Sequence, residues 1–221
     1  MSELFFARRF NTGNARKLQI RLSEKVIQKD CFSEPIQYVG GVDIAYDGKE
    51  SIGAVAVFEY EQMKLVETAT SRQTTTIPYI PTFLSFREIP PTVSAFKKLQ
   101  RTPDVVLVDG QGIAHPRRLG FASHLGLVLD MPTIGVAKSV LCGEVRDNGG
   151  KRWKPLVYKG NVIGAAVETR PHVKPVYVSV GHKVSLESAI KIVLHCARGY
   201  RIPEPLREAH KEAERGKRGK S

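Results

Sequence analysis

The residues best suited to chemistry follow an apolar run in the middle of the chain. Residues 105–108 (VVLV) are typical of a strand buried on both faces, and Asp109 comes directly after them. An ionised carboxylate at the edge of a core is costly unless it is hydrogen-bonded, ion-paired or bound to a metal. The segment continues over residues 109–118 as DGQGIAHPRR, and its arginines suit a partner rich in phosphate. Our first hypothesis is therefore a metal-dependent enzyme that acts on nucleic acid.

A second acid, Asp43, lies in the otherwise apolar segment 38–46 (YVGGVDIAY). A single aspartate in a strand is more often a turn or edge residue than a catalytic one. Two acids embedded in two apolar strands reverse that preference, because an α/β sheet brings such residues together in the crevice at the carboxyl ends of its strands. We therefore expect Asp43 and Asp109 to share a site.

Glu88 is the third candidate acid. It is either a surface residue paired with the neighbouring Arg87 or a further metal ligand, direct or through water. Hard oxygen ligands of this kind suit Mg²⁺, or Mn²⁺ in its place, rather than zinc. Such an ion could activate an attacking water and stabilise the leaving oxygen of a phosphodiester.

Lys138 ends a further apolar stretch, residues 133–138 (TIGVAK). Because lysine is seldom fully buried, it either points into the same crevice, where it could neutralise a phosphate or hydroxide, or snorkels to the surface. His115, His182 and His210 are isolated, without HxH or HxxxH spacing, so a histidine metal cluster is not expected. Taken singly, each histidine is more often structural than catalytic.

The loop Pro78-Tyr79-Ile80-Pro81 fixes the backbone on both sides of an aromatic side chain. One interpretation is a wedge that enters the base stack where a base has been displaced. The other is a rigid loop that buries its aromatic ring in the core, and composition alone favours this second interpretation.

Composition limits the class of protein. The 221 residues are 42% hydrophobic, so we expect one α/β domain over residues 1–215, followed by a basic, disordered tail at 216–221. The net charge of +12 favours a polyanionic partner, although a generally basic protein would fit equally well. Three widely spaced cysteines argue against a disulfide framework and a zinc site and fit a reducing cytoplasm. No apolar stretch approaches the ~20 residues of a membrane span, so no membrane partner is expected.

The pattern predicts elements that could position these residues. Three closely spaced strands form an antiparallel meander, and later strands alternate with helices, which implies parallel strands joined by crossovers. The expected strands are 37–44, 52–60, 64–71, 105–108, 133–136, 161–168 and 176–180. The expected helices are 12–28, 91–99, 121–129, 185–197 with Ser185 offering a capping hydroxyl, and a last helix opened by Pro203 and Pro205 that runs to about residue 214.

Several motifs along the chain, in this order, resemble those of the endonuclease V family. They are PYIP at 78–81, LSFRE at 84–88, DGQGIAHPRR at 109–118 and GVAKS at 135–139, with support from SVGH at 179–182 and PEP at 203–205. The resemblance extends from Gly41 to the region of His210. It implies an RNase H-like fold, with a central mixed sheet of three antiparallel strands followed by parallel strands, flanked by helices.

The resemblance also implies roles for the candidate residues. The acids at Asp43 and Asp109 would bind a catalytic Mg²⁺, and Glu88 would contribute through water. Lys138 would lie near the scissile phosphate, and His210 close to the metal.

Recognition residues follow from the resemblance in the same way. Tyr79, within the 78–81 loop, would be the wedge, and Gly110, Gly112 and His115 would line the pocket for the flipped base. Arg87, Arg117 and Arg118 are expected to contact phosphate. This sequence departs from the family pattern at Thr82, where a glycine often follows the wedge and where threonine is expected to stiffen the loop. It also departs at residues 206–209 (LREA), beside His210.

The implied activity is that of a DNA repair endonuclease that acts as a cytoplasmic monomer on DNA containing deoxyinosine. It would cleave the second phosphodiester 3′ to the lesion, leaving 3′-hydroxyl and 5′-phosphate ends. One alternative is an endoribonuclease that cleaves inosine-containing RNA. Another is a catalytically silent nucleic-acid-binding module, which would have to explain three acids in a protein that binds anions.

Overall fold

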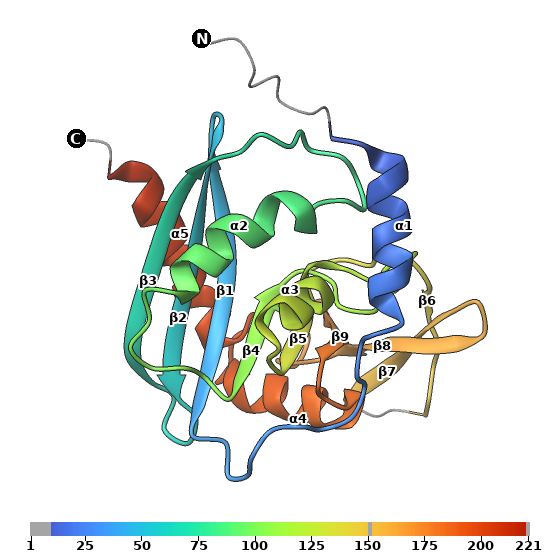
Figure 1. Ribbon diagram of the computed structural model, residues 1–221. Helices are drawn as coiled ribbons and strands as arrows, with labels where there is room; N and C mark the ends of the chain where they lie inside the picture. The colour runs from blue at the N-terminus through green and yellow to red at the C-terminus, as the bar shows by residue number, and fades with distance from the viewer. Residues whose placement is uncertain (1–9, 150–151, 220–221) are drawn as a thin grey trace, which may run out of the picture.

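The protein is built on one mixed sheet. The computed structural model describes residues 10–149 and 152–219. Its strands are β1 (Tyr38–Asp47), β2 (Glu50–Glu59), β3 (Lys64–Thr74), β4 (Val105–Asp109), β5 (Thr133–Ala137), β6 (Glu144–Val145), β7 (Trp153–Tyr158), β8 (Asn161–Val167) and β9 (Val176–His182). Within the described residues they pair in the order β3-β2-β1-β4-β5-β9-β8-β7-β6 (Figure 1).

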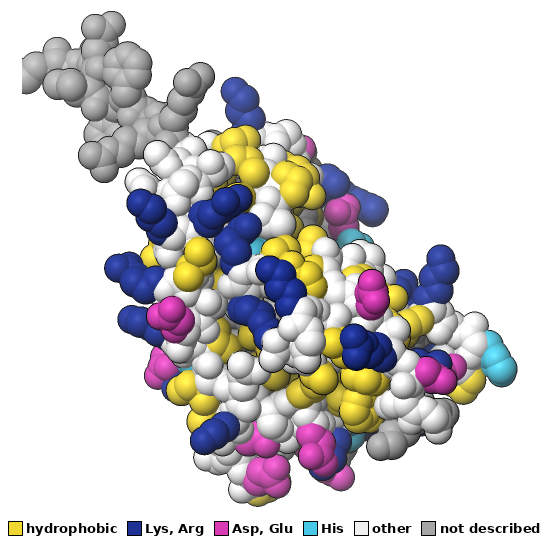
Figure 2. All heavy atoms as spheres, turned by 90° about the vertical axis from the view of Figure 1, so that its right-hand side faces the viewer, with side chains coloured by type: hydrophobic (Ala, Val, Ile, Leu, Met, Phe, Trp, Pro, Cys, Tyr) yellow, Lys and Arg dark blue, Asp and Glu magenta, His cyan; other side chains and the backbone are white. Residues whose placement is uncertain are grey.

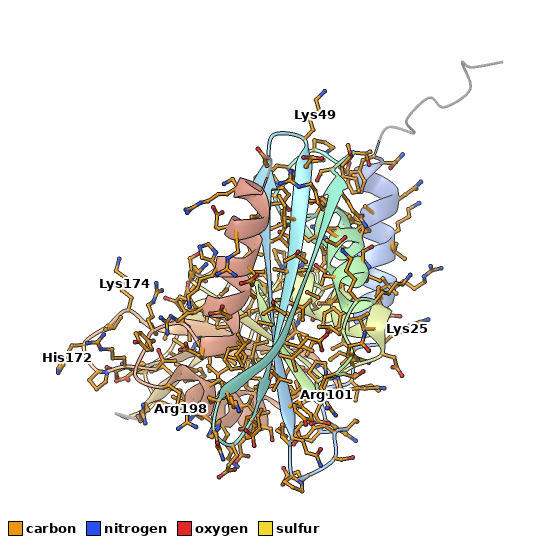
Figure 3. All side chains as sticks on the ribbon, turned by 90° about the vertical axis from the view of Figure 1, so that its left-hand side faces the viewer. Lys25, Lys49, Arg101, His172, Lys174 and Arg198 are labelled. Carbon is orange, nitrogen blue, oxygen red and sulfur yellow. The ribbon has the colours of Figure 1, made fainter. Side chains whose placement is uncertain are left out.

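Helices cover both faces of this sheet. They are α1 (Thr12–Ser23), α2 (Ser85–Phe96), α3 (Phe121–Leu129), α4 (Leu186–Ala197) and α5 (Glu204–Arg218). In Figure 1, α2 and α3 lie in front of the sheet and α5 lies behind it. Figure 3 looks toward β3 and shows the strands between α5 on one side and α2 on the other. The fold is thus a helix–sheet–helix sandwich with apolar side chains on both sheet faces.

Two glycines allow the helices to approach the sheet closely. A Cβ added to Gly41 on β1 would come within 2.2 Å of the Pro205 backbone in α5. A Cβ on Gly53 of β2 would come within 2.7 Å of the Pro91 backbone in α2. Because these contacts are with backbone atoms that cannot move aside, the strand pair needs glycine at both positions. Residues on the same face of β1 as Gly41 therefore point toward α5.

The predicted antiparallel meander of β1, β2 and β3 is confirmed, and so is the parallel pairing of β1, β4 and β5. The expectation of further parallel strands is wrong, because β9 runs antiparallel to β5 and β8 antiparallel to β9. The reason lies in the connection: between β5 and β9 the described chain forms β6, β7 and β8 instead of a crossover helix. Two short strands were not predicted: β6, which has two residues, and β7, which contains Pro155.

Several helix boundaries also differ from the prediction. Helix α2 begins at Ser85 rather than 91, because Pro90 and Pro91 lie inside the helix instead of opening it. Helix α1 ends at Ser23 rather than 28, and Val26, which extended the apolar pattern, packs from the following loop against the core. Helices α3 and α4 match their predicted ranges closely, and the Ser185 hydroxyl caps α4 by accepting the Ser188 amide.

The predicted tail is partly helical. Helix α5 continues through residues 216–218 to Arg218, and the guanidinium of Arg72 on β3 donates to the Gly216 carbonyl at 2.5 Å. The expectation of disorder from residue 216 is therefore wrong for these three residues, because contacts with the sheet hold the last turn. Residues 220–221 lie outside the described residues.

The three cysteines and the helix lengths can be checked directly in the structure. Cys31, Cys142 and Cys196 are all free thiols. Within the part of the chain that the structure describes, every helix is too short or too polar to span a bilayer.

Candidate active site

Strand register places Asp43 and Asp109 next to each other. In the parallel pair β1–β4, Val42 lies opposite Val108, so the next residue of each strand is an aspartate. Both carboxylates share a sheet face with residues that pack toward α5, namely Gly41 on β1 and Leu107 on β4. The juxtaposition predicted from the two apolar segments is therefore a direct result of the hydrogen-bonded ladder.

Asp43 is held by its own strand and by α5. Its Oδ1 accepts the backbone N–H of Ile44 at 2.8 Å, and its Oδ2 accepts Nδ1–H of His210 at 2.7 Å. Burial raises the pKa of Asp43, and the negative charge of Asp109 raises it further, while the contact with His210 opposes both effects. The structure thus brings His210 into the site through the aspartate on β1.

Asp109 is paired with Lys138, the residue that follows β5. The Lys138 ammonium donates to Asp109 Oδ2 at 2.5 Å. Burial lowers the pKa of Lys138, but the bond to Asp109 and the charges of Asp109 and Asp43 outweigh it, so the net shift is upward. The Lys138 carbonyl accepts from the guanidinium of Arg201 at 3.0 Å, and Arg201 also donates to the carbonyls of residues 174 and 175. Arg201, which fixes the backbone at Lys138, was not predicted from the sequence.

Glu88 reaches the same edge from α2, on the other side of the sheet. It is only 6% exposed, its Oε1 accepts the Tyr46 hydroxyl at 3.2 Å, and its Oε2 is buried without a hydrogen-bond partner. Burial raises the pKa of Glu88 to about 8, and the charges of Asp43 and Asp109 contribute to the rise. A buried oxygen left without a partner is unusual and is suited to receive a ligand. We refer to Asp43, Glu88 and Asp109 as the acid cluster.

The acid cluster fits a hard cation by its chemistry. Its donors are three carboxylates, which Mg²⁺ and Mn²⁺ favour, and their mutual repulsion would be relieved by a divalent ion. Across residues 10–149 and 152–219, however, no three His, Cys, Asp or Glu side chains are already grouped as a metal site. His210 and Lys138 each bond to one oxygen, Oδ2, of an aspartate, so an ion held by the acid cluster would share these carboxylates with them.

A cavity of about 210 Å³ opens beside the acid cluster. Its lining includes Glu88, Gly110, His115 and Tyr79. The cavity therefore adjoins the acid cluster through Glu88. Gly112, which the resemblance assigns to the base pocket, is not among the described residues that line this cavity. Its amide donates to the Ser179 hydroxyl, and an added Cβ would come within 2.0 Å of the Val180 carbonyl, so this glycine serves close packing beneath the site.

Tyr79 projects from the protein at the rim of this cavity. It is 67% exposed, so the interpretation that the loop buries its aromatic ring in the core is wrong. The loop ends in a tight turn in which the Phe83 N–H donates to the Ile80 carbonyl at 3.0 Å. An aromatic ring held by this turn at a cavity mouth is available to stack against a ligand.

The three arginines expected to contact phosphate have different environments. Arg87 stacks on the Tyr46 ring at 4.2 Å and has a buried Nε without a partner. Arg117 donates from Nε to Gln19 and from one terminal nitrogen to Thr82, so part of its head group is engaged within the protein. Arg118 is half-buried. Arg117 is half-buried, and these bonds use Nε and one of its two terminal nitrogens, so its expected contact with phosphate stays a prediction.

Two polar residues of this region, Tyr46 and Gln19, were not predicted to matter, although each stands in an otherwise apolar pattern. Tyr46 carries a hydroxyl in the same apolar segment as Asp43 and donates to Glu88. Gln19 lies four residues after Ala15, on the buried face of α1, where a polar side chain needs a partner.

Comparison with known proteins identifies the family. Residues 20–211 match the protein-family model for endonuclease V. The chain belongs to the endonuclease V family. The endonuclease V of Trichormus variabilis is 53% identical over 201 residues, covering 89% of this chain and 90% of that protein.

Solved endonuclease V structures share the fold. The enzyme from Streptomyces avermitilis superposes with a TM-score of 0.88 at 38% identity, covering 93% of this chain and 92% of that one. A Ciona intestinalis endonuclease V, in complex with DNA containing an inosine followed by a ribo-adenosine, gives a TM-score of 0.83 at 33% identity, covering 94% and 97% of the two chains. The predicted RNase H-like fold is confirmed.

Proposed function

We propose that this protein is a metal-dependent endonuclease that recognises deoxyinosine in DNA and hydrolyses the second phosphodiester 3′ to the lesion, leaving 3′-hydroxyl and 5′-phosphate ends. The observation that carries the proposal is the register-matched pair Asp43 and Asp109 beside a cavity with an exposed tyrosine at its rim. Membership of the endonuclease V family supports it, as does the inosine-containing DNA bound by the Ciona relative.

The acid cluster would hold Mg²⁺, with Mn²⁺ as a substitute. A divalent ion bound there supplies charge stabilisation for a phosphodiester and lowers the pKa of water. Lys138 stays protonated beside Asp109 and can neutralise a phosphate oxygen. His210, bonded to Asp43, can hold a proton at the same edge. Together, Lys138 and His210 place one hydrogen-bond donor on each aspartate of the acid cluster.

The cavity and Tyr79 suit recognition of an extruded base. Flipping a nucleotide costs a few kcal/mol, and less for a mispaired base such as hypoxanthine opposite thymine. Tyr79 can offset part of that cost by stacking against the bases left behind. Gly110 lines the cavity without a side chain, so its backbone can approach the base edge.

Positive charge is available to bind the duplex. The net charge is +12, and α1 presents Arg16, Lys17 and Arg21 as exposed side chains without an acidic residue in the helix. Figure 2, which views the molecule from the α1 side of Figure 1, shows Lys and Arg side chains spread across this face. Such binding should weaken steeply with salt, because phosphate contacts release counterions.

A 5′-labelled duplex with one deoxyinosine tests the proposal. The duplex is incubated with Mg²⁺, with EDTA, or with Mg²⁺ and the Asp43→Ala protein. We expect one nick, one nucleotide beyond the lesion's own 3′ linkage, in the Mg²⁺ lane alone. An uncleaved duplex in all lanes, with binding retained, would instead indicate a nucleic-acid-binding module without catalytic activity.

A second candidate substrate is a strand with ribose after the inosine. The Ciona relative is bound to DNA in which a ribo-adenosine follows the inosine, so this linkage merits a direct comparison. Cleavage rates are measured on an all-deoxy strand, a strand with a single ribonucleotide 3′ to inosine, and an all-ribose strand. Much faster cleavage of the all-ribose strand would assign the protein as an inosine-dependent endoribonuclease.

A further inference from the structure

Thr82 has a backbone conformation that rarely accommodates a β-branched residue. The residues 80–83 form a turn closed by the Phe83 N–H and the Ile80 carbonyl, with Pro81 at its second position. Thr82 follows at the third position with φ of 69°, where a type II turn normally requires glycine. A β-branched residue with positive φ is costly unless surrounding contacts hold it. The chain must therefore stabilise this conformation from outside the turn.

Three side chains converge on Thr82 and supply that stabilisation. The Thr82 carbonyl accepts from Gln19 Nε2 at 2.9 Å, from Arg117 at 2.9 Å and from His115 Nε2 at 3.1 Å. His115 Nδ1 accepts the Arg117 backbone N–H, so Nε2 carries the proton and is the donor. Arg117 also donates to the Thr82 hydroxyl at 2.5 Å. This hydroxyl bond exists because the residue is threonine instead of glycine.

Gln19 and Arg117 are themselves fixed in place. Gln19 is fully buried on α1, and its Oε1 accepts Arg117 Nε at 2.5 Å. The Arg117 guanidinium also lies 4.5 Å from the centre of the Phe83 ring. Because Gln19 has no exposed surface, any effect it has on a bound nucleic acid must pass through the groups that it holds.

We propose that Gln19, Arg117 and Thr82 form a clamp that positions Tyr79 and thereby sets the preference for a duplex that contains the lesion. The clamp fixes the turn three residues after Tyr79, and the two prolines of residues 78–81 transmit that constraint along the short loop. Its members are positioning residues for recognition, and they leave hydrolysis to the acid cluster. This inference rests on the proposed function.

The decisive variant is Gln19→Leu, which removes bonds to Thr82 and Arg117 and a longer contact with the Leu119 carbonyl, from a fully buried position. Ala15→Gly is the matched control, because it weakens α1 at a buried position and leaves the clamp intact. Affinities for a deoxyinosine duplex and for the same duplex without the lesion are measured in EDTA. Fluorescence of 2-aminopurine beside the lesion reports unstacking, and single-turnover rates are measured with Mg²⁺ at saturating enzyme.

We expect Gln19→Leu to reduce the preference for the deoxyinosine duplex by about tenfold, the effect expected from loss of one or two buried hydrogen bonds. The 2-aminopurine signal should fall with it, while the saturating rate stays near that of the wild type. Ala15→Gly should lower the melting temperature and retain the preference. A loss of preference in both variants, or in neither, would overturn the clamp.

Thr82 provides a second, independent pair. Thr82→Val keeps the shape and removes the hydroxyl acceptor, whereas Thr82→Ser keeps the acceptor, so only the valine variant should lose preference. Equal preference in these two variants would count against the hydroxyl bond.

Arg117→Ala separates the clamp from a direct phosphate contact. If Arg117 contacts phosphate instead, this variant will bind both duplexes equally more weakly and its binding will depend less on salt, which would overturn the clamp. If the wild-type protein binds both duplexes equally, the proposed function is refuted. If the wild type prefers the deoxyinosine duplex and the variants keep the same preference, only the clamp is refuted.

Discussion

The acid cluster and the Tyr79 loop are positioned by different means, although they border one cavity. Asp43 and Asp109 are adjacent because the β1–β4 ladder sets their register. The Tyr79 loop is held by side chains, mainly the donors that converge on Thr82. A backbone ladder holds the two aspartates whatever the neighbouring side chains are, whereas a single substitution can remove one side-chain bond that holds the loop. The comparison suggests that specificity in this protein can be altered without loss of the hydrolytic site.

The two regions also differ in electrostatics. In the acid cluster, burial and neighbouring carboxylates raise the pKa values of Asp43 and Glu88. Next to the loop, burial and the charge of Arg117 lower the pKa of His115 to about 4, so it stays neutral and donates to Thr82. The acid cluster is thus suited to bind a cation, whereas the Tyr79 loop is held in part by a neutral imidazole ring.

The largest effect should come from breaking the acid cluster. Asp43→Ala or Asp109→Ala should reduce single-turnover cleavage by at least about 10³-fold, because catalytic groups that act together lose most of their effect when one is removed. Affinity for the deoxyinosine duplex should change little. Glu187→Ala, at an exposed acid on α4, is the control and should remain active. Undiminished turnover in either aspartate variant would remove the metal-site claim.

Truncating the loop aromatic should give the converse pattern. Tyr79→Ala should lower the preference for the deoxyinosine duplex by roughly 10- to 100-fold, because stacking on an aromatic ring contributes ~1–3 kcal/mol per base. Affinity for an undamaged duplex should be nearly unchanged, since phosphate contacts supply it. Tyr79→Phe keeps the ring and should retain the preference. If the phenylalanine variant loses as much as the alanine variant, stacking is not the role of this residue.

A smaller effect sharpens the electrostatic side of the comparison. His124 on α3 is buried, its Nδ1 contacts the Ser85 hydroxyl, and burial lowers its pKa from 6.5 to about 4. The unfolded chain therefore binds a proton more readily than the folded one between these values. Its contribution to stability is present above pH 6.5 and is lost as pH falls toward 4.

Denaturant unfolding at several pH values measures this contribution. Between pH 6.5 and 4, the free energy of unfolding of the wild type should fall more steeply than that of His124→Gln, by up to about 1.4 kcal/mol per pH unit. The difference between the two proteins isolates His124 from groups such as Glu88, whose raised pKa acts in the opposite direction. Parallel pH profiles would show that His124 does not titrate as its burial implies.

The sequence predicted the parts of the site that depend on local patterns. The apolar runs around Asp43 and Asp109 identified two core strands, and their parallel pairing follows from the fold class. The direction of β9 was not predictable in the same way, because it depends on whether the intervening chain forms a helix or hairpins. Periodicity describes one element at a time and contains little information about such connections.

The clamp shows a second limit of sequence patterns. Gln19 bonds to Thr82, 63 residues away, and to Arg117, 98 residues away, so no local spacing relates the three. Arg117 was expected to contact phosphate because arginine beside the Asp109 site suits a partner rich in phosphate. Its bonds to Gln19 and Thr82 join distant parts of the chain, which only the folded structure brings together.

The division of labour between the two regions is tested most directly by one paired measurement. Asp109→Asn and Tyr79→Ala are compared with the wild type on a 5′-labelled duplex with a single deoxyinosine, for saturating single-turnover rate and for preference over an undamaged duplex. We expect Asp109→Asn to lose cleavage rate and keep the preference for deoxyinosine, and Tyr79→Ala to lose the preference and keep the rate. Comparable losses of both quantities in both variants would contradict it.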